Sequence, residues 1–199
     1  MTSLWPYATP GIPDHLFEQL PGIPISKREV RLLIVGALRL RPTARLWDVG
    51  AGTGTLVIEA ALLCPQGQVV AVERDEEVAT LIRQNCDRFG LSNVEVVEGL
   101  APDCLADLPP HPDCIIIEGG RSMKEIVQAA WSYLPSGGRM VVTTGTLETL
   151  YGISETFSTL RVRNVEIVQP AINRLETRGY QQVFKSIDPI FILSGEKLE

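Results

Sequence analysis

Hydrophobic residues fall alternately into short runs and helical repeats along this chain. Short apolar runs, each typical of a buried strand, stand at 46–49, 69–73, 94–98, 113–117 and 139–144. Apolar positions at helical spacing predict helices at 26–39, 55–63, 75–89, 121–134 and 147–160. Because strands and helices alternate, the sequence predicts an α/β fold, a mostly parallel sheet covered on both faces.

The two ends of the chain depart from this alternation. Residues 1–24 are rich in proline and glycine and are expected to be irregular. Ser26 and Glu29 then form a capping-box pattern at the start of the first helix. Segments 165–172 and 182–194 are strand-like with no long helix between them, so we expect a C-terminal antiparallel hairpin. Five parallel strands and this hairpin make a seven-stranded sheet, in a single domain of residues 1–199.

Composition narrows the function only slightly. The formal net charge of −6 argues against nucleic-acid binding, and no apolar run approaches the ~20 residues of a membrane span. The four cysteines are widely spaced without a C-x-x-C pair, which predicts reduced thiols in a cytoplasmic protein without a signal peptide. The two histidines lie far apart and indicate no metal site.

The turn after the first strand carries the clearest chemical signal. It reads D-V-G-A-G-T-G from Asp48 to Gly54, with helix 55–63 directly behind it. Glycines permit φ > 0 and let a ligand approach the backbone, and a helix N-terminus favours a carboxylate. Glu73 ends the next strand, where a carboxylate about 20 residues past such a turn accepts hydrogen bonds from ribose hydroxyls. An ordinary tight turn with a solvated acid is the less favoured alternative.

The spacing differs from the dinucleotide-binding fingerprint, because Thr55 stands where G-x-G-x-x-G needs its third glycine. The D-x-G-x-G-x-G form resembles motif I of the Rossmann-like class I methyltransferases that depend on S-adenosyl-L-methionine (SAM). In many of these enzymes an acid after the third strand contacts the adenine. This chain has Leu100 there, so backbone groups of Leu100 and Ala101 are expected to replace it.

Two charged residues follow the fourth strand. Glu118 and Arg121 flank a pair of glycines at the sheet edge where ligands bind in open α/β folds. They are either substrate-binding groups or an ordinary helix entry, and the sequence leaves both interpretations open. It has neither an N-P-P-Y signature nor a nucleophilic cysteine motif, so no catalytic residue is assigned.

Further motifs extend the resemblance over nearly the whole chain. They are Gly11-Ile12-Pro13-Asp14, Ser26-Lys27-Arg28-Glu29-Val30-Arg31, Asp48 to Gly54, Glu98-Gly99-Leu100-Ala101-Pro102, Thr146-Leu147-Glu148-Thr149, Asn173-Arg174 and Asp188-Pro189. In this order they resemble the CbiT family of precorrin methyltransferases, also found as the C-terminal half of the fused CobL enzyme. The resemblance implies C-methylation of a (cobalt-)precorrin at C(15), coupled to decarboxylation of the ring C acetate, in cobalamin biosynthesis.

The resemblance also implies site residues and partners. The implied SAM contacts are Ser26, Gly50, Ala51, Gly52, Thr53, Gly54, Glu73, Leu100 and Ala101. Ser26 is compatible with a capping role as well. Glu118, Arg121 and Arg174 are the candidates for substrate binding, because arginine recognises carboxylates bidentately and a corrin precursor carries many. The family is typically tetrameric, so a homotetramer is expected, and a separate C(5)-methyltransferase similar to CbiE is a candidate partner.

Two other functions stay open on the sequence. The first is a SAM-dependent methyltransferase acting on RNA, protein or another substrate, which predicts basic or aromatic clustering at the strand edge. The acidic balance of the chain argues against it. The second is a SAM-binding module without catalysis, which would bind the cofactor and turn over no tetrapyrrole.

Overall fold

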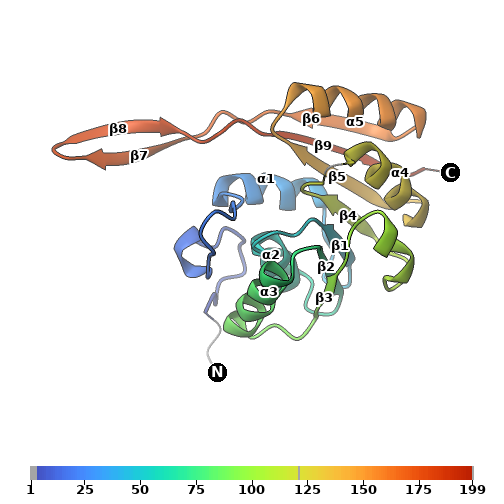
Figure 1. Ribbon diagram of the computed structural model, residues 1–199, viewed down its shortest axis with the longest axis horizontal. Coiled ribbons are helices and arrows are strands. Elements are labelled where there is room, and N and C mark those ends of the chain that lie inside the picture. Colours follow the sequence, from blue (N-terminus) through green and yellow to red (C-terminus); the bar gives the residue numbers. More distant parts are fainter. Residues whose placement is uncertain (1–3, 121, 199) are drawn as a thin grey trace.

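The structure, a computed structural model, describes residues 4–120 and 122–198. Within these residues a seven-stranded sheet has the order β3-β2-β1-β4-β5-β9-β6 (Figure 1). Its strands are β1 (Arg45–Val49), β2 (Gln68–Glu73), β3 (Val94–Glu98), β4 (Cys114–Ile117), β5 (Arg139–Thr144), β6 (Arg163–Val168) and β9 (Phe191–Glu196). The helices are α1 (Arg28–Leu38), α2 (Thr55–Leu63), α3 (Glu76–Phe89), α4 (Met123–Tyr133) and α5 (Leu147–Thr159).

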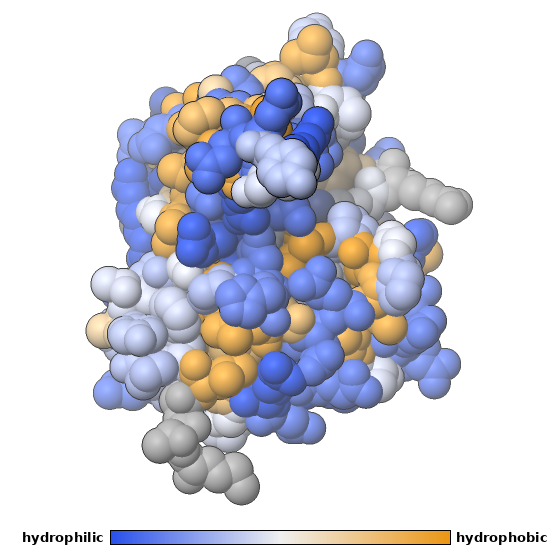
Figure 2. Space-filling model, turned by 90° about the vertical axis from the view of Figure 1, so that its left-hand side faces the viewer, coloured by the Kyte–Doolittle hydropathy of each residue, from blue (hydrophilic) through white to orange (hydrophobic). Residues whose placement is uncertain are grey.

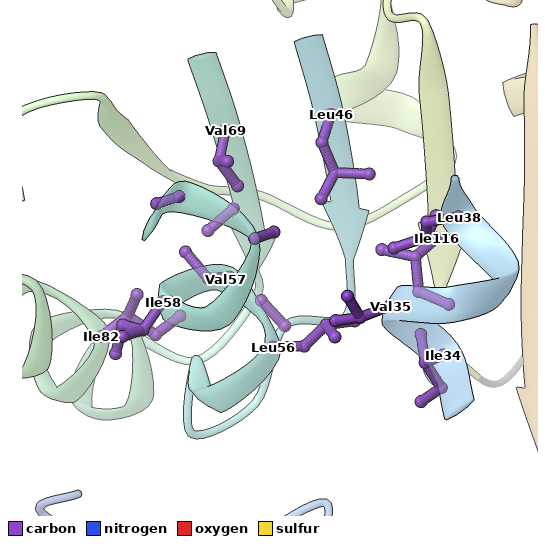
Figure 3. Close-up of a cluster of buried hydrophobic side chains, with 14 of the residues drawn as sticks. Ile34, Val35, Leu38, Leu46, Leu56, Val57, Ile58, Val69, Ile82 and Ile116 are labelled. Atoms are coloured by element: carbon purple, nitrogen blue, oxygen red, sulfur yellow. The ribbon is translucent and has the colours of Figure 1, made fainter. Parts of the chain in front are cut away.

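The first five strands are parallel, and β9 runs antiparallel between β5 and β6. Successive residues of a strand point to opposite faces, so Leu46 and Trp47 of β1 enter different cores. Helices α1, α2 and α3 cover the face of Leu46, as Figure 3 shows, and α4 and α5 cover the face of Trp47. The predicted α/β fold with a mostly parallel seven-stranded sheet is confirmed.

Local signals fix both ends of α3. Asp75 caps α3, because its Oδ1 accepts hydrogen bonds from the backbone amides of Glu77 and Val78 at 3.0 and 3.2 Å. Gly90 ends the same helix in the left-handed conformation, with φ of 68°. Helix α2 spans the predicted 55–63.

The predicted capping box at the first helix is wrong. Helix α1 begins at Arg28, and its N-cap residue, Lys27, makes no side-chain cap. The backbone amide of Arg28 instead donates to Oδ1 of Asp14 at 3.0 Å. Ser26 and Glu29 therefore do not cap the helix, and their side chains contact other parts of the chain.

The two predicted C-terminal strands do form an antiparallel pair, but their predicted bounds are wrong. The pair in the main sheet is β6 with β9, whereas the predicted strand at 182–194 includes parts of two different strands. Pro189 interrupts it, because proline cannot donate to a strand ladder. Between β6 and β9 lie β7 (Asn173–Arg178) and β8 (Gln181–Ser186), a separate two-stranded hairpin that projects from the body (Figure 1).

A two-residue turn joins β7 to β8. Arg178 pairs with Gln181, and Gly179 between them has φ of 60°, as the tight turns of hairpins require. None of the helices found in the described residues is long and apolar enough to cross a membrane.

Candidate active site

A cleft of about 530 Å³ opens at the carboxyl edge of the sheet. The loop after β1 and Glu118 after β4 line its inner part. One wall is the segment before α1, from Pro24 to Lys27, and the other is the hairpin with the residues that follow it. Ligands of open α/β folds bind at this edge, so the cleft lies where the sequence predicts the site.

The glycine loop has the backbone conformation that the motif predicts. Gly50, Gly52 and Gly54 have φ of 78°, 53° and 76°, which favours glycine. A Cβ on Gly50 would lie 3.0 Å from the carbonyl oxygen of Gly119, so the loops after β1 and β4 touch there. A Cβ on Gly52 would meet nothing within 4 Å, and Gly52 lines the cleft. The loop therefore offers bare backbone to a ligand, directly before the N-terminus of α2.

Glu73 is joined to this loop by a hydrogen bond. Its Oε2 accepts from the backbone amide of Gly52 at 3.0 Å, and its Oε1 accepts from the amides of Arg74 and Asp75 at 2.9 and 3.2 Å. The carboxylate is thus held at the end of β2 beside the loop. This is the placement that a ribose acceptor needs.

The predicted adenine side lies one strand further along the edge. The amide of Gly99, which follows β3, donates to the carbonyl of Glu73 at 2.9 Å, so this turn adjoins Glu73. Leu100 is 57% exposed, and its carbonyl accepts from the amide of Cys104 at 3.1 Å. Of the predicted cofactor residues, Ser26, Gly50, Ala51, Gly52 and Thr53 line the cleft, whereas Gly54, Glu73, Leu100 and Ala101 are not among its lining residues.

Ser26 contacts a group on the substrate side. Its Oγ donates to Oε2 of Glu118 at 2.9 Å. Burial raises the pKa of Glu118 to about 7, although Ser26 and Arg31 act in the opposite direction. The neighbouring Asp48 is fully buried, and neither of its oxygens has a hydrogen-bond partner in the described part of the chain. Burial, with the carboxylates of Glu118 and Glu73, raises the pKa of Asp48 well above its usual range.

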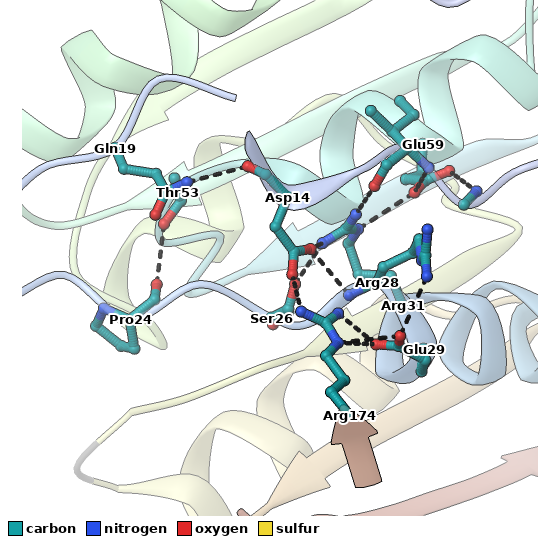
Figure 4. Close-up of polar contacts among 12 residues, drawn as sticks. Asp14, Gln19, Pro24, Ser26, Arg28, Glu29, Arg31, Thr53, Glu59 and Arg174 are labelled. Atoms are coloured by element: carbon teal, nitrogen blue, oxygen red, sulfur yellow. Dashed lines mark hydrogen bonds and ion pairs between the residues drawn. The ribbon is translucent and has the colours of Figure 1, made fainter. Parts of the chain in front are cut away.

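Arg174 lines the cleft, and it is already paired (Figure 4). Its Nη1 lies 2.8 Å from Oδ2 of Asp14, and its Nε and Nη2 contact the carboxylate of Glu29. The hydrogen bond from Arg174 lowers the pKa of Glu29. At Asp14 burial acts upward, but hydrogen bonds from Arg31 and Arg174 lower the pKa overall. Arg174 thus joins the base of the hairpin to α1 and to the N-terminal segment.

Sequence reasoning missed two cations of the cleft. Lys27 lines the wall before α1, and no ion pair found in residues 4–120 and 122–198 includes it. Lys185 of β8 lines the opposite wall, 3.6 Å from the carboxylate of Glu176. The turn at Gly179 was the sequence signal that could have located Lys185. A two-residue turn there sets the register in which Lys185 pairs with Arg174 on the neighbouring strand. Arg121, a predicted substrate residue, lies outside the described residues.

The cysteines are free and take no part in the cleft. Cys64, Cys86 and Cys114 are buried. Burial raises the pKa of the Cys86 and Cys114 thiols to about 12, so they stay protonated at neutral pH. Among the described residues no group of acids, histidines or cysteines is arranged to hold a metal ion.

The residues present fit SAM. The amides at the start of α2 suit its carboxylate, and Glu73 suits its ribose hydroxyls. Glu118 lines the same cleft, and a cationic ligand beside it would favour its ionised form. Fold and site together define a class I SAM-dependent methyltransferase.

Comparisons with known proteins narrow this class. Residues 17–197 match the family model described as a precorrin methyltransferase domain. A protein of Saccharolobus solfataricus, named a probable cobalt-precorrin-6B C(15)-methyltransferase (decarboxylating), is 36% identical over 97% of this chain and 98% of its own length. A protein of the same name from Pyrobaculum calidifontis is 38% identical over 96% and 98%.

Solved structures agree with the sequence comparisons. The precorrin-6y C5,15-methyltransferase of Geobacter metallireducens has a TM-score of 0.88 and 34% identity, over 94% of this chain and 97% of that one. A precorrin 8W decarboxylase of Methanobacterium thermoautotrophicum has a TM-score of 0.85 and 30% identity, over 92% and 98%. The chain belongs to the precorrin methyltransferase family.

Proposed function

We propose that this chain is a SAM-dependent enzyme that methylates a (cobalt-)precorrin at C(15) and removes carbon dioxide from its ring C acetate. The observation that carries the proposal is the match over nearly the full length of relatives named for this reaction, at 36% and 38% identity. The cleft supports it, because it joins a cofactor loop to a wall that carries cations. A role in methylating RNA has no comparable support.

The chain's own residues mainly bind and orient. SAM supplies an electrophilic methyl group on its sulfonium when it is bound. The loop from Gly50 to Gly54 and the carboxylate of Glu73 would hold the cofactor against the sheet edge. The hairpin and the segment before α1 wall the cleft on two sides. Orientation of this kind accounts for a site with few catalytic groups.

The substrate would enter between the two walls. Its acetate and propionate side chains need cationic partners, and Lys27, Arg174 and Lys185 are the cations of the described cleft residues. Arg174 already neutralises Asp14 and Glu29, so a substrate carboxylate would share its guanidinium. Glu118 faces the same space from the end of β4. We include Glu118 and Arg174 in the substrate site, together with Lys27 and Lys185.

The decisive experiment is incubation with cobalt-precorrin-6B and methyl-labelled SAM, followed by mass spectrometry. The expected product gains one labelled methyl group and loses one carbon dioxide. A cofactor-binding module without catalysis would bind SAM and form no product. Methylation without loss of carbon dioxide would restrict the function to methyl transfer.

Replacing Glu73 by alanine should weaken SAM binding by about 1–3 kcal/mol, because the ribose hydroxyls lose their acceptor. The measurement is titration calorimetry. Glu76→Ala, at the first turn of α3, removes an exposed carboxylate close by and should leave the affinity unchanged. If Glu73→Ala bound SAM as tightly as Glu76→Ala, Glu73 would be excluded from the cofactor site.

Arg174→Ala and Lys27→Ala should each raise the substrate KM roughly ten- to a hundredfold, because a desolvated carboxylate loses its partner. SAM affinity should not change. Arg178→Ala is the matched control, since Arg178 lies on the same strand as Arg174 with a side chain 63% exposed. A wild-type KM in either cleft variant would exclude that residue from substrate binding.

The hairpin supports a homotetramer. It is a two-stranded sheet away from the main one, and such a ribbon is marginally stable alone. Leu175 and Phe184 stand opposite each other on one face of it and are 54% and 74% exposed. Figure 2 looks toward this side of the molecule, where hydrophobic and charged residues lie together. Packing these faces against those of other copies would bury the apolar side chains.

Light scattering tests this assembly. The double variant Leu175→Asp and Phe184→Asp should reduce the mass in solution from four copies to fewer. Tyr151→Asp, on the exposed face of α5, should not change it. A wild-type protein that scatters as a monomer would contradict the proposal.

The four free cysteines suit the cytoplasm, where thiols stay reduced, and we place the reaction there. We also propose that a separate C(5)-methyltransferase supplies the other methyl group.

A further inference from the structure

Two carboxyl groups lie on the same face of neighbouring parallel strands. Asp48 belongs to β1 and pairs with Ile116 of β4, and Glu118 stands two residues after Ile116. Because alternate residues share a face, both side chains are on the side covered by α1 and α2. Asp48 directly precedes the glycine loop in the chain and is not among the residues that line the cleft, whereas Glu118 lines it.

These two groups cannot both carry a full charge. Asp48 is 0% exposed, and no donor among the described residues reaches either of its oxygens. An unpaired carboxylate in such a place is costly, and a second carboxylate beside it raises the cost. Glu118 has one compensating donor, the hydroxyl of Ser26. The pair therefore holds a proton that it can release on the side of Glu118.

The surrounding charges set when the proton is present. Arg31 of α1 favours ionisation of Glu118, whereas Glu73 at the end of β2 opposes ionisation of Asp48. Lys27 and Arg174 line the same cleft further out. Burial outweighs the favourable contacts and raises the pKa of Glu118 to about 7, so the acid form is populated at neutral pH.

The proposed reaction needs such a proton. Breaking the bond between the acetate CH2 and its carboxyl releases carbon dioxide and leaves the electron pair in the macrocycle. That pair forms the new bond from C(15) to the methyl group, and the pair of the S–CH3 bond stays on sulfur. The former acetate carbon is left as an exocyclic =CH2, which becomes a methyl group only when it gains a proton.

We infer that Glu118, with the buried Asp48 beside it on the neighbouring strand, protonates this methylene carbon; the inference rests on the proposed function. The π pair of the methylene forms the new C–H bond, and a ring N–H or C–H then returns a proton to the carboxylate pair. The cycle consumes no net proton. Glu118 is the donor in this step, and Asp48 acts through Glu118.

The first test is turnover of cobalt-precorrin-6B in D2O by the full chain. Wild-type protein should place one deuterium in the new ring C methyl group. Glu118→Gln keeps the shape and the acceptor for Ser26 but has no acid proton. It should complete this methyl group about a hundredfold more slowly and release an isomer with vinylic =CH2 signals in NMR. Glu125→Gln, on the exposed side of α4, is the matched control.

The second test needs neither cofactor nor substrate. A carboxyl group whose pKa is higher in the folded chain than in the unfolded chain binds more protons when folded. The free energy of unfolding should therefore fall as pH rises from about 4.5, the unfolded value, to about 7. Glu118→Gln and Asp48→Asn should each lose a large part of this slope, and Glu125→Gln should keep it.

The outcomes separate the two proposals. If wild-type protein forms no demethylated cofactor and no carbon dioxide, the proposed function fails, and this inference fails with it. If wild-type protein turns over and Glu118→Gln matches it in rate and deuterium content, only the inference is overturned. A variant whose sole defect is weaker SAM binding would also overturn it, as would an unchanged pH slope in Glu118→Gln.

Discussion

Arg31→Ala is expected to lower the free energy of unfolding by about 3–5 kcal/mol, because it leaves a buried carboxylate without its partner. The Arg31 side chain is 0% exposed, and its Nε lies 3.2 Å from Oε1 of Glu59, which is 1% exposed. Its Nη1 lies 2.8 Å from Asp14, and its guanidinium carbon lies 4.9 Å from the centre of the Phe17 ring. Its guanidinium also donates to the carbonyls of Ile12 and Ser26.

The same contacts tie the N-terminal segment to the body. Glu59 accepts hydrogen bonds from the backbone amides of Gly11 and Ile12, both at 2.9 Å. Without Arg31, the wall of the cleft that carries Ser26 and Lys27 would lose its anchor (Figure 4). The Arg31→Ala protein should therefore also bind substrate more weakly.

Urea unfolding checks the prediction. Arg28→Ala is the control from the same helix, because the Arg28 side chain is 45% exposed and its ion pair with Glu29 spans 3.4 Å. It should change the free energy of unfolding by no more than about 0.5 kcal/mol. A loss below about 1 kcal/mol for Arg31→Ala would show that the network contributes little to stability.

The main sheet was predictable because its parallel strands are buried on both faces. Strand β4 consists of Cys114 and three isoleucines, all buried, and such a run is visible in the sequence. The separate hairpin of β7 and β8 was not predicted, because neither strand buries a face in this chain. Because neither side of these strands is buried, their sequence has no regular alternation of apolar and polar residues. The insertion of β9 between β5 and β6 is a matter of topology, which local patterns do not specify.

In the site, too, some parts could be predicted from the sequence and others could not. The glycine loop and Glu73 belong to one strand–helix–strand unit, so their spacing along the chain reflects their spacing in the fold. The bond from Ser26 to Glu118 joins positions 92 residues apart, and that from Arg174 to Glu29 joins positions 145 apart. Such contacts form only when separate elements meet. The sequence therefore suggested a cofactor contact or a cap for Ser26 and a substrate-binding role for Arg174, but neither of these two bonds.

Gly52→Asn is expected to weaken SAM binding at least about a hundredfold, roughly 2.8 kcal/mol. Gly52 has φ of 53° and lines the cleft, and a Cβ there would enter open space. Asparagine tolerates this left-handed conformation better than most residues, so the fold should persist. Its side chain would then occupy the space beside the loop that the cofactor needs.

Gly90 supplies a control with the same backbone conformation. It has φ of 68°, ends α3, and would also place a Cβ in open space, but it does not line the cleft. Gly52→Asn and Gly90→Asn should lose similar amounts of unfolding free energy, about 1 kcal/mol or less. Only Gly52→Asn should lose SAM affinity by calorimetry. Full affinity in that variant would show that the cofactor does not approach this loop, and equal losses in both would trace the effect to backbone strain.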